Sequence, residues 1–398
     1  MINPIRGLTG LQFVRLPKGE LSRTYMGIAV RDLAFNLAAI FEPIYLYLFF
    51  KDNFSFSPLA LVCIYYATFY VFLGLFSPLG AKLASKIGFR WIGLISSPLR
   101  GSYYIILALL PVFPYLLPFA LLALSVSSIL YWPGFHVFLA HVSNRPNRAT
   151  SIGMVNIIGT VAAATSPVLG GIILVLFNYT VLFSATFVLL LISIFMFWFS
   201  PKVTDHYNEG IFSALKKTLS PNSWRISVPF IASGIEERIN GIMWPLFLFL
   251  LAVSYSSLGL IITISLVISL VVTYIMARAS DKFGEEKILE IGIMQQIFSC
   301  LGRIIVNSPL SAAVVHGFYG FSSAMTVVPF SSILYRDISN SGESYAALII
   351  REQSLNIGRV ILLCSSAVFF MFSSNFIPIF ILAAVATAFK SIIILPKN

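Results

Sequence analysis

Long runs of apolar residues, separated by short polar or Pro- and Gly-rich breaks, recur along the whole chain. Because a hydrocarbon core about 30 Å thick needs about 20 apolar residues per helix, each run is long enough to cross a membrane. The pattern predicts twelve spans, at 24–50, 58–80, 91–113, 115–141, 150–177, 180–200, 226–252, 257–277, 288–307, 310–334, 344–372 and 375–395. We therefore expect an all-α polytopic membrane protein.

The longest stretch of soluble character lies at the centre of the chain, between the sixth and seventh predicted spans. It covers residues 201–224 and reads PKVTDHYNEGIFSALKKTLSPNSW. This position predicts an N-terminal six-helix bundle at 1–200, a cytoplasmic linker at 201–224 and a C-terminal six-helix bundle at 225–398. Within the linker, a short interfacial helix is expected around Ile211–Leu219.

The composition is that of a membrane protein. Of the 398 residues, 58% are hydrophobic and 10% are charged, whereas typical soluble domains have about 25% charged residues. The three cysteines, Cys63, Cys300 and Cys364, lie inside apolar runs, so we expect neither a disulfide framework nor a metal site. The sequence has no phosphate-binding glycine loop with lysine, no HExxH and no GxSxG motif. We therefore expect no enzymatic activity and no cofactor.

The net charge of +11 is explained by the predicted topology. If both termini are cytoplasmic, most of the 26 Lys and Arg residues lie in cytoplasmic tails and loops, which fits the positive-inside rule for an even number of spans. The chain is therefore expected to be an integral protein of the plasma (cell inner) membrane. Since the basic residues are spread over short loops against the membrane, we expect lipid as a partner and no nucleic acid.

One short loop occurs twice, roughly 200 residues apart. It reads LASKIGFR at 83–90 and RASDKFGEEK at 278–287, each time between two apolar runs. Gly88 and Gly284 occupy matching places in the two copies. A duplicated loop of this kind predicts that the protein consists of two similar half-molecules joined in one polypeptide, as in many membrane transporters.

The two loops resemble the signature loop of the major facilitator superfamily, which runs approximately G-x-L-A-D-R-x-G-R-K between spans two and three and recurs in degenerate form between spans eight and nine. The first copy matches at Leu83, Ala84, Lys86, Gly88 and Arg90, with Ser85 in place of the aspartate, and the second keeps Asp281, Lys282 and Gly284. The segment SPVLGGIIL, at 166–174, is similar to a fifth-span motif of the family's exporters. The resemblance implies two pseudo-symmetric six-helix bundles and secondary transport, with spans one, four, seven and ten lining a central cavity.

The repeated loop has two interpretations. A glycine at a helix end permits close approach or a left-handed backbone, and the neighbouring charges can pair with helix termini or carboxylates across the cytoplasmic face. Such pairs would hold one conformation shut, which makes the loop a gate. Alternatively, the basic residues only anchor the loop in the cytoplasm. The candidate gating residues are Lys86, Gly88, Arg90, Asp281, Lys282 and Gly284.

Charged residues inside the spans are the strongest functional signal, because each costs at least about 2–3 kcal/mol in hydrocarbon and normally faces a cavity or a partner. In the first span, Arg31 and Glu42 are eleven positions apart, so on a continuous helix they lie within about 20° of one face. Asp32 and Asn36 form a neighbouring polar face. Snorkelling to the membrane surface is an alternative for Arg31 and Asp32. Glu42 is expected to carry a proton or contact substrate.

In the seventh span, helical spacing predicts a polar stripe that ends in an aromatic side chain. The stripe consists of Ser233, Glu237, Asn240 and Trp244, with Glu236 and Arg238 beside it. The resemblance implies that Glu42 and Glu237 face each other across the pseudo-twofold axis. The alternative is an internal Glu–Arg pair that only fixes the packing between the halves.

The eleventh span carries a second polar stripe. It consists of Glu352, Asn356 and Arg359 at positions i, i+4 and i+7, next to Arg351. In the family this helix lies along the interface between the halves. These charges therefore either bind an anionic group or form a salt bridge that depends on the conformational state, and the sequence leaves both possibilities open.

Histidines and further arginines lie in other spans. His136, beside Trp132, and His316 lie in the fourth and tenth spans, and their equivalent positions in two cavity-lining helices favour a role in binding substrate or protons. Arg100 and Arg303, in the third and ninth spans, are expected to lie at the periphery of the transport pathway and to pair with a neighbouring helix.

These observations predict a secondary active transporter that moves a small organic solute by alternating access, coupled to protons, with export favoured over import. The expected partners are the solute, protons and membrane lipid, and the expected state is a monomer. A uniporter or a lipid-handling flippase of the same fold is one alternative. A ligand receptor that has lost transport is another.

Overall fold

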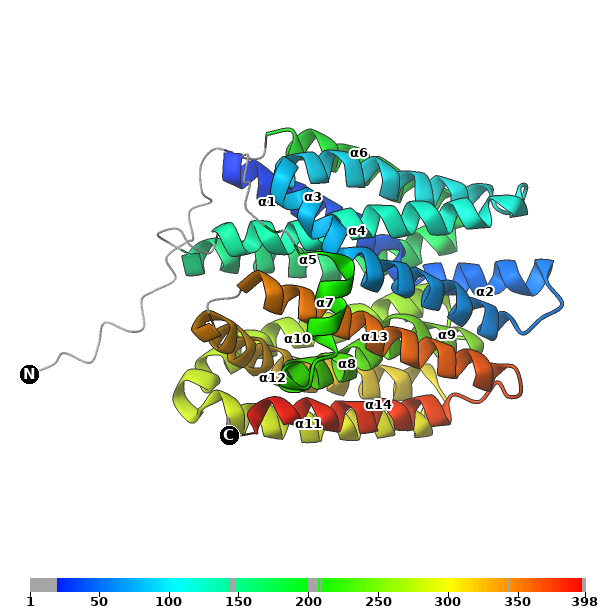
Figure 1. Ribbon diagram of the computed structural model, residues 1–398. Coiled ribbons are helices and arrows are strands. Elements are labelled where there is room, and N and C mark those ends of the chain that lie inside the picture. Colours follow the sequence, from blue (N-terminus) through cyan, green and yellow to red (C-terminus); the bar gives the residue numbers. More distant parts are fainter. Residues whose placement is uncertain (1–19, 143–147, 200–206, 208, 342–343, 396–398) are drawn as a thin grey trace, which may run out of the picture.

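The apolar runs fold into long helices (Figure 1). The computed structural model describes residues 20–142, 148–199, 207, 209–341 and 344–395, and every regular element in these ranges is helical. The first six helices are α1 (Glu20–Ala39), α2 (Glu42–Asn53), α3 (Pro58–Leu109), α4 (Leu117–Val142), α5 (Arg148–Leu176) and α6 (Tyr179–Phe197). The others are α7 (Ile211–Thr218), α8 (Trp224–Arg238), α9 (Trp244–Leu250), α10 (Tyr255–Phe283), α11 (Glu285–Gly302), α12 (Pro309–Ser341), α13 (Ser344–Phe370) and α14 (Ile377–Phe389).

The first and seventh spans are each divided into two helices just before a proline. The chain leaves the helix between α1 and α2 at residues 40–41, and Pro43 lies in the first turn of α2. A π-helical turn, Ile239–Met243, joins α8 to α9, and Pro245 lies in the first turn of α9. Proline has no N–H and crowds the carbonyl four residues earlier, so a regular helix is disfavoured at both places. The same break therefore occurs in both halves.

The repeated loop has the same backbone conformation in both copies. Helix α3 contains the second and third spans and turns at Gly88, where φ is 82° and ψ is 159°. Gly284 separates α10 from α11 with φ 89° and ψ 136°. These are the two glycines with positive φ among the described residues. The predicted equivalence of the two loops is thus confirmed in the backbone, because residues with a side chain rarely adopt this conformation.

Eight helical segments in the described residues are long and apolar enough to cross a membrane, and the 52-residue α3 among them contains two predicted spans. In the fifth span the apolar helix Val161–Leu176 is shorter. The seventh span is less apolar because Glu236, Glu237 and Arg238 lie together in its middle. The beginning of α1 and the end of α14 lie at the same end of the molecule, as expected for an even number of crossings (Figure 1).

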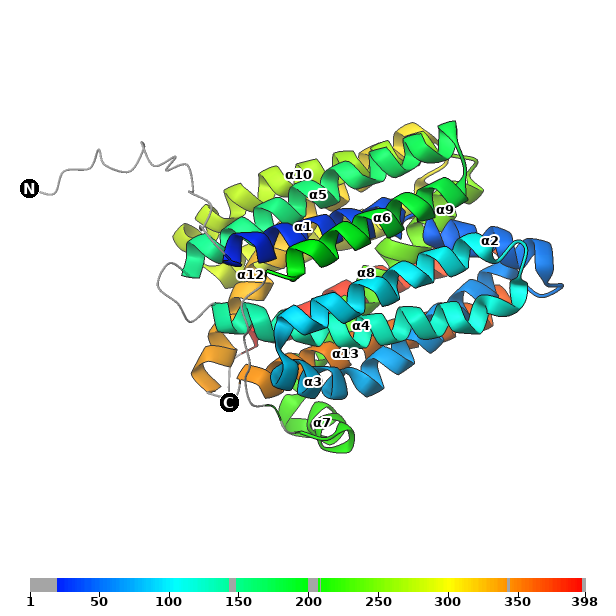
Figure 2. The same cartoon turned by 90° about the horizontal axis from the view of Figure 1, so that it is seen from above.

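The two halves meet along two pairs of helices, α5 with α10 and α3 with α13 (Figure 2). At the α5–α10 crossing, a Cβ atom on Gly171 would lie 2.6 Å from the Tyr255 carbonyl oxygen, and one on Gly259 would lie 2.3 Å from that of Pro167. Only glycine fits at such distances. The backbones of the two halves are therefore in direct contact, as small residues permit between membrane helices.

Hydrogen bonds join the α3–α13 pair at both ends. Near the α2–α3 loop, the Ser57 hydroxyl donates to the Phe370 carbonyl at 2.7 Å. Further along α3, Gln353 Nε2 donates to the Gly74 carbonyl at 3.4 Å. The halves are therefore bonded to each other on both sides of the centre of the molecule.

The predicted linker helix is present as α7, which crosses from one half to the other (Figure 1). It packs against both α3 and α13. The buried contact consists of Ala81, Tyr207, Ala214 and Ile349. The Thr218 hydroxyl donates to Gln353 Oε1 at 2.7 Å, while Phe212 points away from the protein and is 86% exposed. Residues 201–206 and 208 of the predicted linker lie outside the described part.

Candidate functional site

A cluster of charges lies where α8 and α13 meet the first half of the chain. Arg359 Nη2 donates to Glu237 Oε2 at 2.7 Å, and Arg359 Nη1 donates to Asn356 Oδ1 at 2.9 Å. The two helices approach closely because Gly358 faces α8, where a Cβ atom would lie 2.0 Å from the Ile231 carbonyl oxygen. We call Glu237, Arg238, Arg351, Glu352 and Arg359, with the tyrosine and histidine that contact them, the interface cluster.

The contact of this cluster with the first half is an aromatic residue of α3, Tyr70. Arg238 Nη1 donates to the Tyr70 hydroxyl at 2.7 Å. The guanidinium groups of Arg238 and Arg359 lie 5.5 and 5.1 Å from the centre of the Tyr70 ring, which is close enough for cation–π attraction. The side chain of Glu237 is 38% exposed and that of Arg359 is 12% exposed. The side chain of Glu237 is therefore only partly enclosed by protein in the middle of a predicted span.

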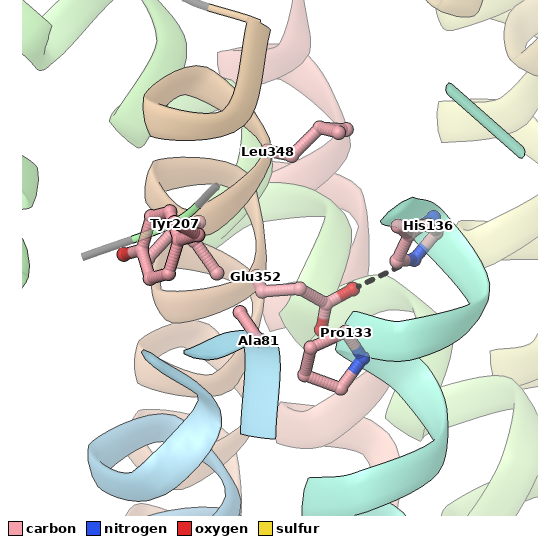
Figure 3. A pocket seen from close by; sticks show the side chains of 7 residues that line it. Ala81, Pro133, His136, Tyr207, Leu348 and Glu352 are labelled. Carbon is pink, nitrogen blue, oxygen red and sulfur yellow. Dashed lines mark ion pairs between the residues drawn. The ribbon is translucent and has the colours of Figure 1, made fainter. Parts of the chain in front are cut away.

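A second ionic contact joins the halves about two helical turns along α13. Glu352 Oε1 lies 3.3 Å from His136 Nε2 of α4, and Arg351 Nη1 donates to the same Glu352 oxygen at 2.9 Å. Both side chains line a small pocket together with Pro133 and Tyr207 (Figure 3). The pocket is closed on one side by the linker.

Tyr207 is the linker residue in this pocket (Figure 3). Burial, with Glu209 nearby, raises the pKa of its hydroxyl, so the side chain is neutral at ordinary pH. The hydroxyl has no hydrogen-bond partner. The linker therefore covers the His136–Glu352 contact with an uncharged, largely apolar side chain.

In the first half, Arg31 lies in the interior. Its Nη1 donates to Ser97 at 2.6 Å, and its guanidinium lies 3.9 Å from the centre of the Tyr131 ring. Arg31 is buried, so the snorkelling alternative is wrong for this residue. Asp32 lies beside Gly159 of α5, and Asn36 donates to the Asp32 carbonyl rather than to its carboxylate.

Glu42 has partners of its own. The Tyr66 hydroxyl donates to Glu42 Oε1 at 2.8 Å, and Arg100 lies within electrostatic reach. Arg100 also donates to the Tyr104 hydroxyl at 3.4 Å. Arg31 and Glu42 lie on either side of the interruption between α1 and α2 and bind different partners, so their common face stays a prediction.

A third group of charges is enclosed within the second half, between α8, α11, α12 and the end of the chain. Lys390 Nζ lies 3.1 Å from Glu236 Oε2, and each side chain is 5% exposed. The Tyr319 hydroxyl and Asn240 Nδ2 also donate to Glu236, and Arg303 donates to Asn240. We call these five residues the enclosed cluster. Arg303 is fully buried in it and is bonded to Asn240 of the seventh span.

Aromatic rings surround this enclosed cluster. The Arg303 guanidinium lies 4.8 Å from the centres of both the Trp244 and the Tyr319 rings. His316 is stacked on the same two rings, at 5.6 and 5.4 Å. Trp244 and His316 are therefore packing partners of Arg303 and are buried inside one half.

The predicted stripe of the seventh span is divided between the two clusters. Glu237 accepts a hydrogen bond from Arg359, whereas Asn240 donates to Glu236 and accepts from Arg303. Asn240 lies four residues after Glu236, the spacing at which side chains meet on a regular helix, and the π-helical turn begins at the residue before it. The expectation that Glu237 and Asn240 act from one face is wrong.

The profile of the Major Facilitator Superfamily matches residues 25–350. The chain belongs to this family. Its members are membrane transporters, so this chain is an integral membrane protein of the secondary transporter kind. A search of curated proteins found no matching sequence.

Solved structures of the superfamily share the fold at low sequence identity. The human organic anion transporter MFSD10 (TETRAN) matches with a TM-score of 0.68 and 13% identity, over 94% of this chain and 99% of its own. The nucleoside transporter NupG gives 0.69 and 12%, over 94% and 98%. A D-xylose-proton symporter gives 0.67 and 15%, over 93% and 96%. At these identities the likeness shows the fold alone.

The superfamily's signature loop is only partly described. Lys86 is exposed, and the Arg90 guanidinium lies 5.1 Å from the Trp198 ring at the end of α6, within the same half. Ser85, at the aspartate position, is buried and donates to the Lys82 carbonyl. The side chains of Asp281 and Lys282 lie outside the described part, so the gating hypothesis stays a prediction.

Several residues of these clusters were not among the predicted site residues of this superfamily member. Tyr66 and Tyr70 are one helical turn apart on α3 and contact Glu42 and Arg238, and their i, i+4 spacing was the available signal. Lys390 gives no such signal, because a lysine near a span end usually reaches the membrane surface. Trp132, which was predicted, is partly exposed and stacks near His136.

Proposed function

We propose that this superfamily member moves a small organic solute across the plasma membrane by alternating access, with proton coupling at Glu237. The moving units would be the halves 1–200 and 225–398, joined by the linker 201–224, with both termini in the cytoplasm. The single observation that supports the site is the Glu237–Arg359 pair beside Tyr70, with a partly exposed carboxylate between the halves.

Protonation of Glu237 removes its charge and weakens its bond to Arg359. The freed guanidinium can then bind solute, and the contact of α8 with Tyr70 of the other half changes with it. The His136–Glu352 contact is the second link between the halves that depends on protons, since it is an ion pair only when the histidine is charged. Proton binding and relative movement of the halves would be coupled in this way.

The direction of transport is proposed from the fifth span. Its segment at 166–174 is similar to the motif of the family's exporters, which favours export over import. The structural neighbours are named for organic anions, nucleosides and D-xylose, three different chemical classes. The shared fold therefore leaves the solute to be identified from the site itself.

The proposal is tested with purified protein in liposomes that contain a pH-sensitive dye. Carboxylic acids, nucleosides and monosaccharides are added one at a time, and both solute uptake and proton flux are measured. We expect at least one solute to carry protons with it, and Glu237→Gln to abolish the proton flux. The control Lys216→Gln, on the exposed face of α7, should leave the flux unchanged.

Three outcomes would contradict the proposal. Solute movement unchanged after collapse of the pH gradient would indicate a uniporter. Transfer of a fluorescent phospholipid between leaflets, with no solute moved, would indicate a flippase. Ligand-induced stabilisation without any transport would indicate a receptor.

A further inference from the structure

The interface cluster contains more positive than negative charge. Its three guanidinium groups belong to Arg238, Arg351 and Arg359, and its two carboxylates to Glu237 and Glu352. With His136 neutral, the cluster therefore carries one uncompensated positive charge. Charge within a membrane span is costly unless it is paired, so a partner of negative charge is expected.

The other described spans supply no spare carboxylate for this partner. In the first half, Arg31 and Arg100 are balanced by Asp32 and Glu42. In the enclosed cluster, the two positive charges of Arg303 and Lys390 exceed the single carboxylate of Glu236. The excess positive charge of the interface cluster is thus neutralised neither by the carboxylates of the first half nor by that of the enclosed cluster.

The arginines at the interface have unused hydrogen-bond donors. Within the described part of the chain, the Nε atoms of Arg238 and Arg359 are buried and have no hydrogen-bond partner. Both guanidinium groups lie within 5.5 Å of the centre of one ring, that of Tyr70, so they are held near each other. Two adjacent guanidinium groups are suited to the paired oxygens of a carboxylate or phosphate.

The present partner of Arg359 can be exchanged. Glu237 is 38% exposed and is therefore less enclosed than Arg359, which is 12% exposed. An incoming anion of the same charge can take the place of Glu237 and keep the Arg359 guanidinium paired. Protonation of Glu237 would favour this exchange, because the charge of the cluster then rises to two.

We propose that the solute carries an anionic group, a carboxylate or a phosphate, and that this group binds Arg238 and Arg359 between α3, α8 and α13. The inference rests on the transport function proposed above and adds the chemical class of the substrate. It implies that the anion and a proton bind together. The groups that face this site are Tyr70 of α3, His136 of α4, Glu237 and Arg238 of α8, and Arg351, Glu352 and Arg359 of α13.

Binding to the purified full-length protein in micelles tests the inference with matched pairs of probes. Each pair differs only in its anionic group: benzoate and benzamide, glucuronate and glucose, uridine monophosphate and uridine. Thermal stabilisation is measured over a concentration series at pH 5.5 and 7.5. We expect at least one anion to bind at least about tenfold more tightly than its neutral partner, and more tightly at the lower pH.

The variants Arg359→Gln and Arg238→Gln should each weaken binding of that anion at least about tenfold. Lys216→Gln removes the same charge from an exposed position and should leave binding unchanged. If a single variant fails to fold, the double variant Glu237→Gln/Arg359→Gln removes both members of the pair, while Arg238 keeps its bond to the Tyr70 hydroxyl. Arg359→Lys, which keeps the charge, should retain part of the affinity.

Dihexanoyl phosphatidate serves as the lipid probe. Arg359-dependent binding of this lipid, without binding of any soluble anion, would support the anionic site and assign the group to a lipid headgroup. Equal binding of anionic and neutral probes, or anion binding unchanged in both arginine variants, would overturn the inference. Proton-coupled transport of a neutral solute would overturn it while the proposed function stands. Arg359-dependent anion binding without transport would overturn the proposed function while the inference stands.

Discussion

Two neighbouring glutamates of α8 show how one helix serves two different tasks. Glu236 lies inside the second half, bonded to Lys390, Tyr319 and Asn240, and is 5% exposed. Glu237 lies at the interface, bonded to Arg359, and is 38% exposed. Consecutive residues of a helix point about 100° apart, so adjacent carboxylates can face different environments.

The difference in exposure distinguishes an ion pair that stabilises the fold from one that can exchange partners. A buried ion pair depends on complete hydrogen bonding, because neither charge can return to water. An exposed pair forms and breaks at little cost. We therefore assign the enclosed cluster to the stability of the second half and the interface cluster to binding and movement. Three substitutions test this comparison.

Lys390→Ala should have the largest effect. It leaves Glu236 buried without its cation, which should lower the free energy of unfolding by about 3–5 kcal/mol. Unfolding in mixed micelles, followed by tryptophan fluorescence, measures this change. Glu237→Ala should cost less in the same measurement, because the carboxylate that it removes is 38% exposed. The double variant Glu236→Gln/Lys390→Met should recover most of the loss. Wild-type stability of Lys390→Ala would refute the comparison.

Gly358→Ala should have an intermediate effect. The added Cβ atom would lie 2.0 Å from the Ile231 carbonyl oxygen, so α13 must move away from α8. We expect a loss of about 1–3 kcal/mol in unfolding free energy, the range for overpacking. Gly210→Ala is the matched control, because nothing lies within 4 Å of that position. Equal stability of the two variants would show that α8 and α13 are not held together at Gly358.

Tyr70→Phe should have the smallest effect on stability. It removes the hydroxyl that accepts from Arg238 but keeps the ring beneath both guanidinium groups. A loss of about 1 kcal/mol or less in unfolding free energy is expected. Tyr115→Phe, at an exposed tyrosine, controls for the loss of a hydroxyl and should be neutral. A loss as large as that of Lys390→Ala would place Tyr70 with the structural residues.

Much of the fold could be predicted from the sequence, because it depends on local features. Apolar runs of sufficient length give the helices, and Gly88 and Gly284 mark the two equivalent turns by the conformation that they alone tolerate. The linker helix follows from its position between apolar runs. Each of these features is determined by a short stretch of consecutive residues and can be predicted from it.

The partners of the charged residues could not be predicted in the same way. Spacing on a regular helix allows Asn240 to meet either Glu236 or Glu237, and in the structure it bonds to Glu236. Arg303 and Lys390 are far along the chain from Glu236 and meet it only through tertiary packing. Which of two adjacent carboxylates faces the interface is decided by neighbouring helices that the local sequence does not describe.

The linker helix also has a consequence for movement. Thr218 of α7 is bonded to Gln353 of α13, and Gln353 is bonded in turn to the Gly74 carbonyl of α3. Any rocking that separates α3 from α13 at this end must break this three-part chain or carry α7 along with one half. The segment that joins the two halves covalently therefore also holds them together through hydrogen bonds. In the proposed alternating-access cycle, breaking these bonds would add to the free-energy barrier for opening.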